Sequence, residues 1–167
     1  NELNGNSSNL LHSLEFDSIH GKWIAGFKAN DNSININERA IRTTFYNNIE
    51  DMDLNDIDIV IDCTGVNNNK AALKKYFEQG IKKVIVSAPI NEENVANIAY
   101  GINHQTYIPS KHNIITAASC TTNCIAPIIK VLHEKIGIKH GSITTIHNLT
   151  NSQTLVDIPH NLSLIHI

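Results

Sequence analysis

The chain has 167 residues, of which 41% are apolar and 17% charged, and its formal net charge is −3. This composition is typical of a globular protein of one or two domains, and it provides no basic surface of the kind that nucleic-acid-binding proteins need. No apolar run reaches the roughly 18 residues of a membrane helix, and no signal-peptide pattern is visible. We therefore expect no nucleic-acid or membrane partner and a cytoplasmic location.

The first third of the chain is predicted to form one helix and two strands. The helix is expected over residues 8–17 ("SNLLHSLEFD"). Two segments with strand-like sequences follow, residues 22–30 and 39–46, and we expect them to be antiparallel. The polar stretch "NDNS" at residues 30–33 predicts a turn.

From residue 57 onwards the pattern indicates a strand, a helix and a second strand. The short apolar run at residues 57–65 ends in a glycine, as buried parallel strands often do. Residues 69–80 place apolar side chains on one helical stripe and end at Gly80, a natural helix cap. Residues 82–89 form a second apolar run, which Pro89 ends. This order predicts a βαβ crossover with parallel strands, which is half of a doubly wound α/β sheet.

A further strand and a long amphipathic helix are predicted next. Residues 112–119 ("HNIITAAS") form the strand. The helix is expected over residues 121–135, where apolar side chains recur at intervals of three and four: Ile125, Ile128, Ile129, Leu132 and Ile136. Pro127 fits a helix only near its first turn, so we expect the regular part to begin nearer Cys124. A last strand is predicted over residues 141–149.

Two of the three cysteines lie four positions apart in "TAASCTTNC", residues 116–124, and this segment has three possible interpretations. A structural zinc site is disfavoured, because it would need a second tight pair of ligands that the sequence does not contain. A buried core thiol suits Cys124, which lies on the apolar stripe of the helix. It does not suit Cys120, which lies at the junction of strand and helix.

A reactive thiol is the third interpretation, and it concerns Cys120. The N–H groups and the dipole at a helix N-terminus lower the pKa of a thiol and also suit an anion. A nucleophile needs a base, and His147, 27 residues further on, ends "SITTIH" in the strand expected after this helix. The residues alone leave the nucleophile and the core thiol both open.

Several motifs together resemble the phosphorylating glyceraldehyde-3-phosphate dehydrogenase family. They are "ASCTTNC", the proline-containing helix after it, and "TTIH" with a threonine three residues beyond; "DSIHG", "CTGV", "VSAP" and "GIN" precede them in the family's order. The resemblance covers residues 1–161 and includes the spacing from Cys120 to His147.

This resemblance implies a domain organisation. A Rossmann-like NAD-binding domain, without its first strand and glycine turn, is expected over residues 1–119, and the beginning of an α+β catalytic domain over residues 120–161. The chain is therefore expected to be a fragment that is inactive by itself. Residues 162–167 ("LSLIHI") can be encoded by a transposon-end sequence used in sequencing libraries, and we interpret them as an artefact.

The resemblance also implies a mechanism and roles for individual residues. Cys120 would be the nucleophile and His147 the base in the oxidation of glyceraldehyde 3-phosphate to a thioester, with NAD or NADP as cofactor and phosphate as acyl acceptor. Further roles in the family fall on phosphate-binding positions (Ser119, Thr121 and Thr150) and on positions that line the cofactor cleft (Thr64, Gly65, Ser87 and Ala88). No metal is implied, and the full-length family members form homotetramers.

Two departures from the glycolytic pattern leave alternatives open. Residues 43–48 read "TTFYNN" where glycolytic members carry Arg-Asp-Pro, so that cofactor contact is in doubt. Residues 148–161 look more like the branch encoded beside an organoarsenical efflux permease, which would use arsenate instead of phosphate. An enzyme like erythrose-4-phosphate dehydrogenase and a non-catalytic binding remnant are the remaining alternatives.

Overall fold

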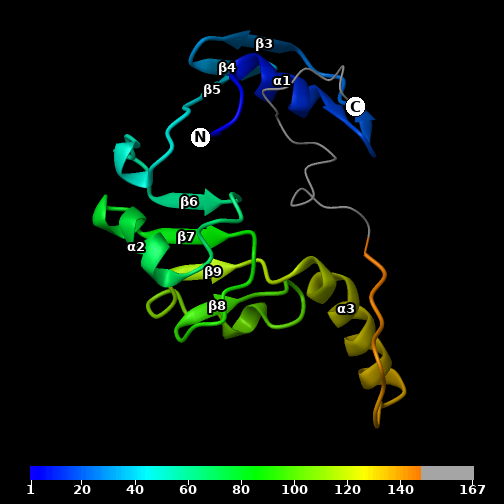
Figure 1. Ribbon diagram of the computed structural model, residues 1–167. Coiled ribbons are helices and arrows are strands. Elements are labelled where there is room, and N and C mark those ends of the chain that lie inside the picture. Colours follow the sequence, from blue (N-terminus) through cyan, green and yellow to red (C-terminus); the bar gives the residue numbers. More distant parts are fainter. Residues whose placement is uncertain (148–167) are drawn as a thin grey trace. The chain divides into compact units, whose positions relative to one another are not determined.

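The computed structural model describes residues 1–147, shown as a ribbon in Figure 1. These residues divide into two compact units. Residues 1–51 with residues 146 and 147 belong to the first, and residues 52–145 form the second. None of the helices in residues 1–147 is long and apolar enough to cross a membrane.

Helix α1 (Ser7–Glu15) opens the first unit, close to its predicted place. It begins at Ser7 because the Asn6 side chain accepts a hydrogen bond from the Asn9 N–H over 3.0 Å, and the Asn9 side chain accepts one from the Asn6 N–H over 3.1 Å. The predicted helix ran two residues too far. Phe16–Asp17 form the short strand β1, which pairs with β2 (Gly21–Lys22).

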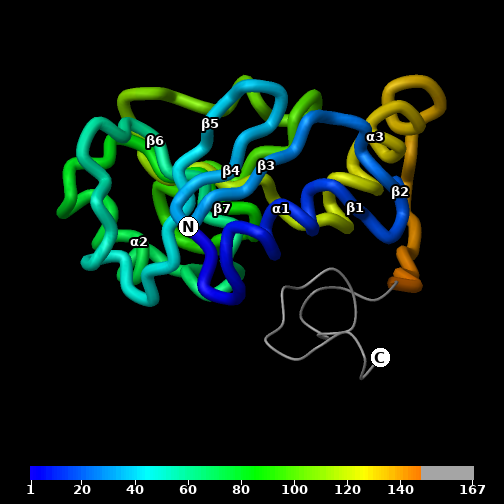
Figure 2. Tube along the Cα trace, turned by 90° about the horizontal axis from the view of Figure 1, so that it is seen from above, coloured from blue at the N-terminus to red at the C-terminus, as the bar shows by residue number. Residues whose placement is uncertain are grey.

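A three-stranded antiparallel sheet packs against α1, and its strands run side by side in Figure 2. They are β3 (Phe27–Asn30), β4 (Ser33–Ile36) and β5 (Arg39–Arg42). Strand β4, which lies between the two predicted strands, was not predicted. The turn from β4 to β5 places Asn37 and Glu38 at φ angles of 46° and 69°. Positive φ at both central residues matches the twist of a tight hairpin, although neither residue is glycine.

Buried polar contacts hold α1 against this sheet. The Ser7 hydroxyl lies 2.9 Å from the Asp31 carbonyl oxygen, to which it donates, and 2.7 Å from the Thr43 hydroxyl. Ser7 and Thr43 are both buried, and Ile34 of β4 is buried among the apolar residues of the unit. Buried hydroxyl groups that are hydrogen-bonded in this way fix the position of a helix on a sheet, and they leave no unpaired donor in the core.

The second unit is built on a four-stranded parallel sheet in the order β6-β7-β9-β8. Its strands are β6 (Ile59–Asp62), β7 (Lys83–Val86), β8 (Val95–Asn97) and β9 (Ile114–Thr116). Helix α2 (Lys70–Glu78) connects β6 to β7. The predicted βαβ crossover and the parallel α/β sheet are therefore confirmed, whereas the short strand β8 was not predicted.

Helix α2 and strand β7 provide the centre of this unit's core. Leu73 and Tyr76 of α2 and Val84 and Val86 of β7 are all buried. Strand β6 was expected to be buried too, and this expectation was wrong. It lies at the edge of the sheet, so that two of its side chains remain largely exposed: Ile59 (53%) and Ile61 (68%).

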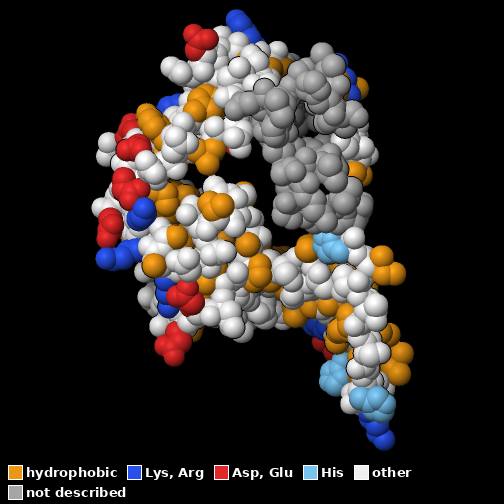
Figure 3. All heavy atoms as spheres, viewed as in Figure 1, with side chains coloured by type: hydrophobic (Ala, Val, Ile, Leu, Met, Phe, Trp, Pro, Cys, Tyr) orange, Lys and Arg blue, Asp and Glu red, His pale blue; other side chains and the backbone are white. Residues whose placement is uncertain are grey.

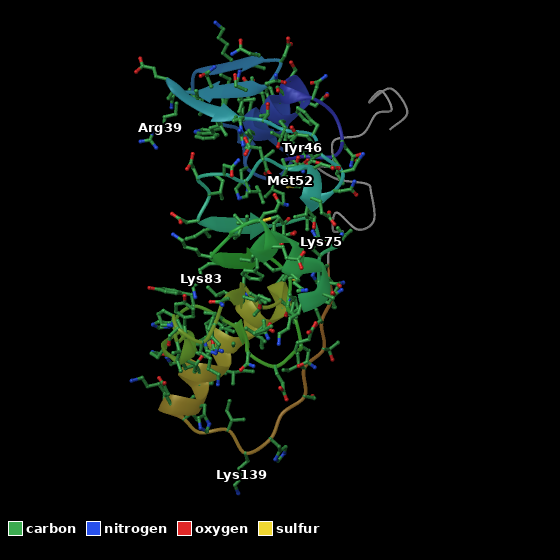
Figure 4. The ribbon with its side chains drawn as sticks, turned by 90° about the vertical axis from the view of Figure 1, so that its left-hand side faces the viewer. Arg39, Tyr46, Met52, Lys75, Lys83 and Lys139 are labelled. Atoms are coloured by element: carbon green, nitrogen blue, oxygen red, sulfur yellow. The ribbon has the colours of Figure 1, made fainter. Side chains whose placement is uncertain are left out.

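A lysine fixes the amino end of β7, opposite the edge that carries the predicted site. The Lys83 ammonium (labelled in Figure 4) donates to the His112 carbonyl oxygen and to Oδ1 of Asn113, both over 2.8 Å, and also to the Pro109 carbonyl oxygen. These acceptors lie in the connection that leads into β9. Lys83 therefore holds that connection against the sheet.

Helix α3 (Cys120–Lys135) follows β9, as predicted, but it begins earlier than expected. Pro127 lies inside the helix rather than near its first turn. It cannot donate to the carbonyl group of Asn123, so the helix forms despite one missing hydrogen bond. The early start is explained by Ser119, which caps the helix through the N–H of Thr122.

The apolar stripe of α3 is exposed, and apolar side chains are visible along this helix in Figure 3. Ile128 and Leu132 are 51% and 43% exposed. Cys124 is exposed as well, which corrects its interpretation as a buried core thiol.

The strand predicted after α3 is absent from the described part of the segment. Residues 141–147 are irregular and exposed, and residues 148 and 149 lie outside the described residues. The β-branched residues of "SITTIH" therefore do not by themselves make a strand here, because no strand of the described residues pairs with residues 141–147.

Candidate functional site

The predicted site residues of the second unit gather at one edge of its sheet. Thr64 and Gly65 follow β6, Ser87 and Ala88 follow β7, and the segment from Ser119 to Thr121 follows β9. The carboxyl ends of parallel strands meet at the same edge of a sheet, which is where open α/β sheets bind ligands.

Backbone hydrogen bonds link the starts of these loops to one another. The Ser87 N–H donates to the Asp62 carbonyl oxygen over 3.0 Å, and the Ala117 N–H donates to the Val86 carbonyl oxygen over 3.0 Å. The ladder between the strands thus continues one residue into each loop. This edge is accordingly an ordered platform rather than a set of independent loops.

The loop after β6 is held by the carboxylate of Asp62. The Thr64 N–H and the Thr64 hydroxyl both donate to Oδ1 of Asp62, over 2.9 Å and 2.6 Å. Gly65 follows with a φ angle of +73°, a conformation that glycine adopts without strain. A Cβ atom added at Gly65 would meet nothing within 4 Å, so the backbone here faces open space. A ligand could therefore approach the loop closely.

The first turn of α3 is organised by side-chain caps. Ser119 Oγ accepts a hydrogen bond from the Thr122 N–H over 3.0 Å and lies 2.7 Å from the Thr122 hydroxyl. The Asn123 side chain donates to the carbonyl oxygens of Ala117 and Ser119, over 2.7 Å and 2.9 Å. Cys120 is the first residue of this helix and is exposed, so its thiol lies where the helix dipole favours negative charge.

A left-handed residue sets the direction in which the chain enters α3. Ala118 has a φ angle of +55° and is buried. Such a conformation costs about 1–2 kcal/mol for a residue other than glycine. The Thr116 hydroxyl oxygen accepts a hydrogen bond from the Ala118 N–H over 3.2 Å and supports this turn. Backbone strain that the surrounding structure maintains is frequent beside functional groups.

A pocket of about 270 Å³ adjoins the start of α3. Ser119, Thr122 and Ala118 line one side of it, and the rest of its wall comes from the β7–β8 loop and the residues around β8: Pro89, Ile90, Asn91, Asn97, Ala99 and Asn103. The pocket lies within the second unit and beside the predicted nucleophile.

Two asparagines in the wall of the pocket are engaged in structural hydrogen bonds. Oδ1 of Asn97 accepts from the Thr116 hydroxyl over 2.6 Å and from the Ile90 N–H over 3.1 Å. The side chain of Asn103, in the "GIN" motif, bonds to the Ala99 N–H over 2.8 Å and to the Asn97 carbonyl oxygen over 2.9 Å. Both amides therefore fix the loops around the pocket rather than stand ready for a ligand.

Sequence reasoning missed several residues that shape this edge. Asp62, Asn97, Thr122 and Asn123 were not singled out, although each makes the side-chain hydrogen bonds described above. The position of Asp62 at the end of an apolar run, two residues before a threonine and three before a glycine, was the available signal.

His147, the predicted base, lies in the irregular segment after α3 and is exposed. It belongs to the first unit and Cys120 to the second, so their pairing stays a prediction. Thr150 and residues 162–167 lie outside the described residues. Within residues 1–147, no group of three or more His, Cys, Asp or Glu side chains could hold a metal ion.

Two family models match the chain. Residues 1–70 match the NAD binding domain of glyceraldehyde 3-phosphate dehydrogenase, and residues 119–165 match the C-terminal domain of the same enzyme. The second match begins at Ser119, the residue that caps α3.

Curated relatives with the same name are similar to nearly the whole chain. Glyceraldehyde-3-phosphate dehydrogenase 3 of Nostoc sp. is 46% identical over 162 residues, which is 96% of this chain and 48% of the relative. Glyceraldehyde-3-phosphate dehydrogenase 1 of Bacillus cereus is 40% identical over 153 residues, 90% of this chain and 46% of the relative. The glyceraldehyde-3-phosphate dehydrogenase of Geobacillus stearothermophilus is 40% identical over 156 residues, which is 92% of this chain and 46% of the relative. The chain thus spans about half the length of the curated relatives it matches.

Proposed function

Since the chain belongs to the glyceraldehyde 3-phosphate dehydrogenase family, we propose that it contributes the thiol site of an NAD-dependent oxidoreductase that oxidises glyceraldehyde 3-phosphate. The observation that carries this proposal is the position of Cys120. It is the first residue of a capped helix, it is exposed, and it lies at the carboxyl edge of a parallel sheet. The proposal concerns the whole enzyme, in which the remaining half of the relatives' length is also present.

Cys120 attacks the aldehyde carbon as a thiolate in the proposed reaction. A C–S bond forms, and the carbonyl oxygen becomes the hydroxyl group of a hemithioacetal after taking up a proton. His147 then accepts that hydroxyl proton as the carbon loses a hydride, which leaves a thioester on Cys120. The N–H groups at the start of α3 favour both the thiolate and the developing oxyanion.

NAD supplies the hydride acceptor when it is bound. Thr64, Gly65, Ser87 and Ala88 are the residues that would hold it, and NADP is the alternative dinucleotide. The open space beside Gly65 and the hydrogen-bonded loop after β6 are compatible with a dinucleotide lying across the carboxyl edge of the sheet.

Phosphate or arsenate is the acyl acceptor that releases the product. An oxygen of the anion attacks the thioester carbon, the C–S bond breaks, and the Cys120 thiolate is restored. We assign the binding of this anion to Ser119 and Thr121 and that of the substrate's own phosphate to Thr150. Hydroxyl and N–H donors do not distinguish the two anions, which have nearly the same geometry and charge. The arsenate-linked role therefore rests on the resemblance of residues 148–161 alone.

The experiment that tests this function uses the full-length enzyme that contains this segment. Wild type and Cys120→Ser are mixed with NAD and the aldehyde phosphate, without phosphate, and NADH is recorded in the first turnover. We expect a burst of about one NADH per site for wild type and none for Cys120→Ser, with Cys124→Ser as the matched thiol control. A normal burst in Cys120→Ser would overturn the assignment, and a wild type without NADH formation would overturn the function.

Three further features of the whole enzyme are proposed on the family resemblance. It is a homotetramer, it acts in the cytoplasm, and its cofactor and catalytic domains meet between residues 119 and 120. Light scattering coupled to gel filtration of the full-length enzyme tests the first of these, with the mass of a single chain as the contradicting result.

A further inference from the structure

Asp62 is the most heavily engaged side chain at the carboxyl edge of the sheet. It is the last residue of β6 and only 2% exposed. Its Oδ1 accepts hydrogen bonds from the N–H and the hydroxyl of Thr64, over 2.9 Å and 2.6 Å. Its Oδ2 accepts from the Asn67 side chain over 2.8 Å and from the Tyr76 hydroxyl over 3.0 Å. The four donors satisfy a carboxylate that would otherwise be costly to bury.

These bonds connect three parts of the structure to one residue. Thr64 and Asn67 belong to the loop after β6, and Tyr76 belongs to α2 and is itself buried. The backbone carbonyl oxygen of Asp62 accepts from the N–H of Ser87, at the start of the loop after β7. The carboxylate of Asp62 therefore fixes the loop after β6, whereas its backbone carbonyl group joins β6 to the start of the loop after β7.

We propose that Asp62 is a positioning residue for dinucleotide binding, because its carboxylate holds the 63–67 loop in one arrangement before the cofactor arrives. This inference rests on the proposed function, since it concerns the cofactor site of that reaction. Asp62 does not touch the cofactor in this proposal. It acts through Thr64, whose conformation its carboxylate fixes.

The physical reason is the cost of ordering a loop during binding. A loop that is already fixed loses little conformational entropy when a ligand binds, whereas a loop released from its anchor must be ordered at the expense of affinity. The 63–67 loop contains Gly65, whose backbone has the largest conformational freedom of any residue. The carboxylate of Asp62 is the side-chain acceptor that holds both donors of Thr64 in place.

The test measures NAD binding in the full-length enzyme by titration calorimetry, together with kcat and both KM values. In Asp62→Asn, the side chain keeps its shape, but an NH₂ group replaces one carboxylate oxygen. This NH₂ group donates, so it faces donors such as those of Thr64 or Tyr76 where the oxygen had accepted from them. We expect its Kd for NAD to rise roughly tenfold or more, while kcat at saturating NAD and the KM for the aldehyde phosphate stay within about twofold. Asp62→Glu, which keeps the carboxylate, should recover part of the affinity.

Asp58→Asn is the matched control. Asp58 lies just before the other end of the same strand, and its exposed carboxylate pairs with Lys82 over 2.6 Å. Asp58→Asn removes the same charge as Asp62→Asn but leaves the hydrogen bonds of the 63–67 loop in place. Its Kd for NAD should therefore stay at the wild-type value. A purely structural role for Asp62 would lower the melting temperature of Asp62→Asn and leave its Kd for NAD unchanged, which would overturn the proposal.

Two gentler variants keep the proposal testable if Asp62→Asn does not fold. Tyr76→Phe and Asn67→Ala each remove one donor to Oδ2, and each should raise the Kd for NAD about threefold. Unchanged affinity in both would overturn the proposal. If wild type binds NAD but does not oxidise the aldehyde, the proposed function fails while the Kd series still decides on Asp62. If wild type binds no NAD, both fail.

Discussion

Tyr76 donates its phenolic hydrogen to Oδ2 of Asp62 over 3.0 Å, and both residues are buried, with exposed fractions of 4% and 2%. Burial raises the pKa of the Tyr76 phenol above its ordinary value, and the negative charge of Asp62 raises this pKa further. Both effects have the same origin, because a phenolate here would lose hydration and face a carboxylate. The pair is stable only while the tyrosine keeps its proton.

This relationship predicts how stability depends on pH. The raised pKa means that the native state keeps the proton of Tyr76 at a pH where the unfolded chain has released it. The contribution of Tyr76 to the free energy of unfolding is therefore complete below pH of about 10 and is lost as the pH rises further. We expect Tyr76→Phe to lower the free energy of unfolding by about 1.5 kcal/mol at pH 8 and by less above pH 10.

Denaturant titrations of the second unit's unfolding at pH 8 and at pH 10.5 check this expectation. Tyr100→Phe is the control, because Tyr100 is 84% exposed and the same hydroxyl is removed without opening the core. A difference between wild type and Tyr76→Phe that is equal at the two pH values would contradict the expected linkage.

The serine cap of α3 predicts a local change in stability. Ser119→Ala removes the acceptor for the Thr122 N–H, which should cost about 1 kcal/mol at the first turn of the helix. Hydrogen exchange of the Thr122 amide should then be about fivefold faster. Ser119→Asp preserves the cap and should keep the exchange slow. If the alanine variant exchanged at the wild-type rate, Ser119 would not be the cap in solution.

Reactivity with an alkylating agent should distinguish the three cysteines, all of which are exposed thiols. Cys120 is at the first position of α3, whereas Cys124 lies one turn further along and Cys63 follows β6. Because the helix N-terminus favours the thiolate, iodoacetamide at neutral pH should modify Cys120 about tenfold faster than the other two. Peptide mass spectrometry over a time course gives the three rates. Equal rates would remove the electrostatic argument for Cys120 as the nucleophile.

Lys83 and Lys82 are neighbours in sequence with different structural roles, and this difference can be measured. Lys83→Met removes the donor to three acceptors at the amino end of β7 and should lower the free energy of unfolding by about 1–2 kcal/mol. Lys82→Met removes an exposed ion pair with Asp58 and should leave the free energy of unfolding nearly unchanged. Thermal or denaturant unfolding of both variants is the measurement. A larger loss in Lys82→Met would show that the lysines had been given the wrong roles.

The parallel sheet of the second unit could be predicted because its strands leave clear local signals. The runs that became β6 and β7 are apolar and end at a turn, and the helical stripe between them is regular. Strand β8 (Val95–Asn97) has three residues, too few for any period to appear. In the first unit β4 was missed because its turn uses Asn37 and Glu38 in place of the glycine that usually marks a tight hairpin.

The candidate site could be predicted only in part. Thr64, Ser87 and Ser119 were assigned from the family resemblance, and the rule that ligands bind at the carboxyl ends of parallel strands agrees with their place on one edge. It did not identify Asp62, because a single aspartate after an apolar run is also an ordinary turn residue. The role of Asn97 depends on Ile90 and Thr116, which are distant in sequence, and no local pattern reports such contacts.

The exposed stripe of α3 has a practical consequence for handling the protein. Its isoleucine and leucine side chains form an exposed apolar surface, and surfaces of this kind drive colloidal association and bind fluorescent dyes such as anilinonaphthalene sulfonate. A preparation of the chain should therefore fluoresce with that dye before any denaturant is added, and its solubility should improve when Ile128 or Leu132 is replaced by a charged residue.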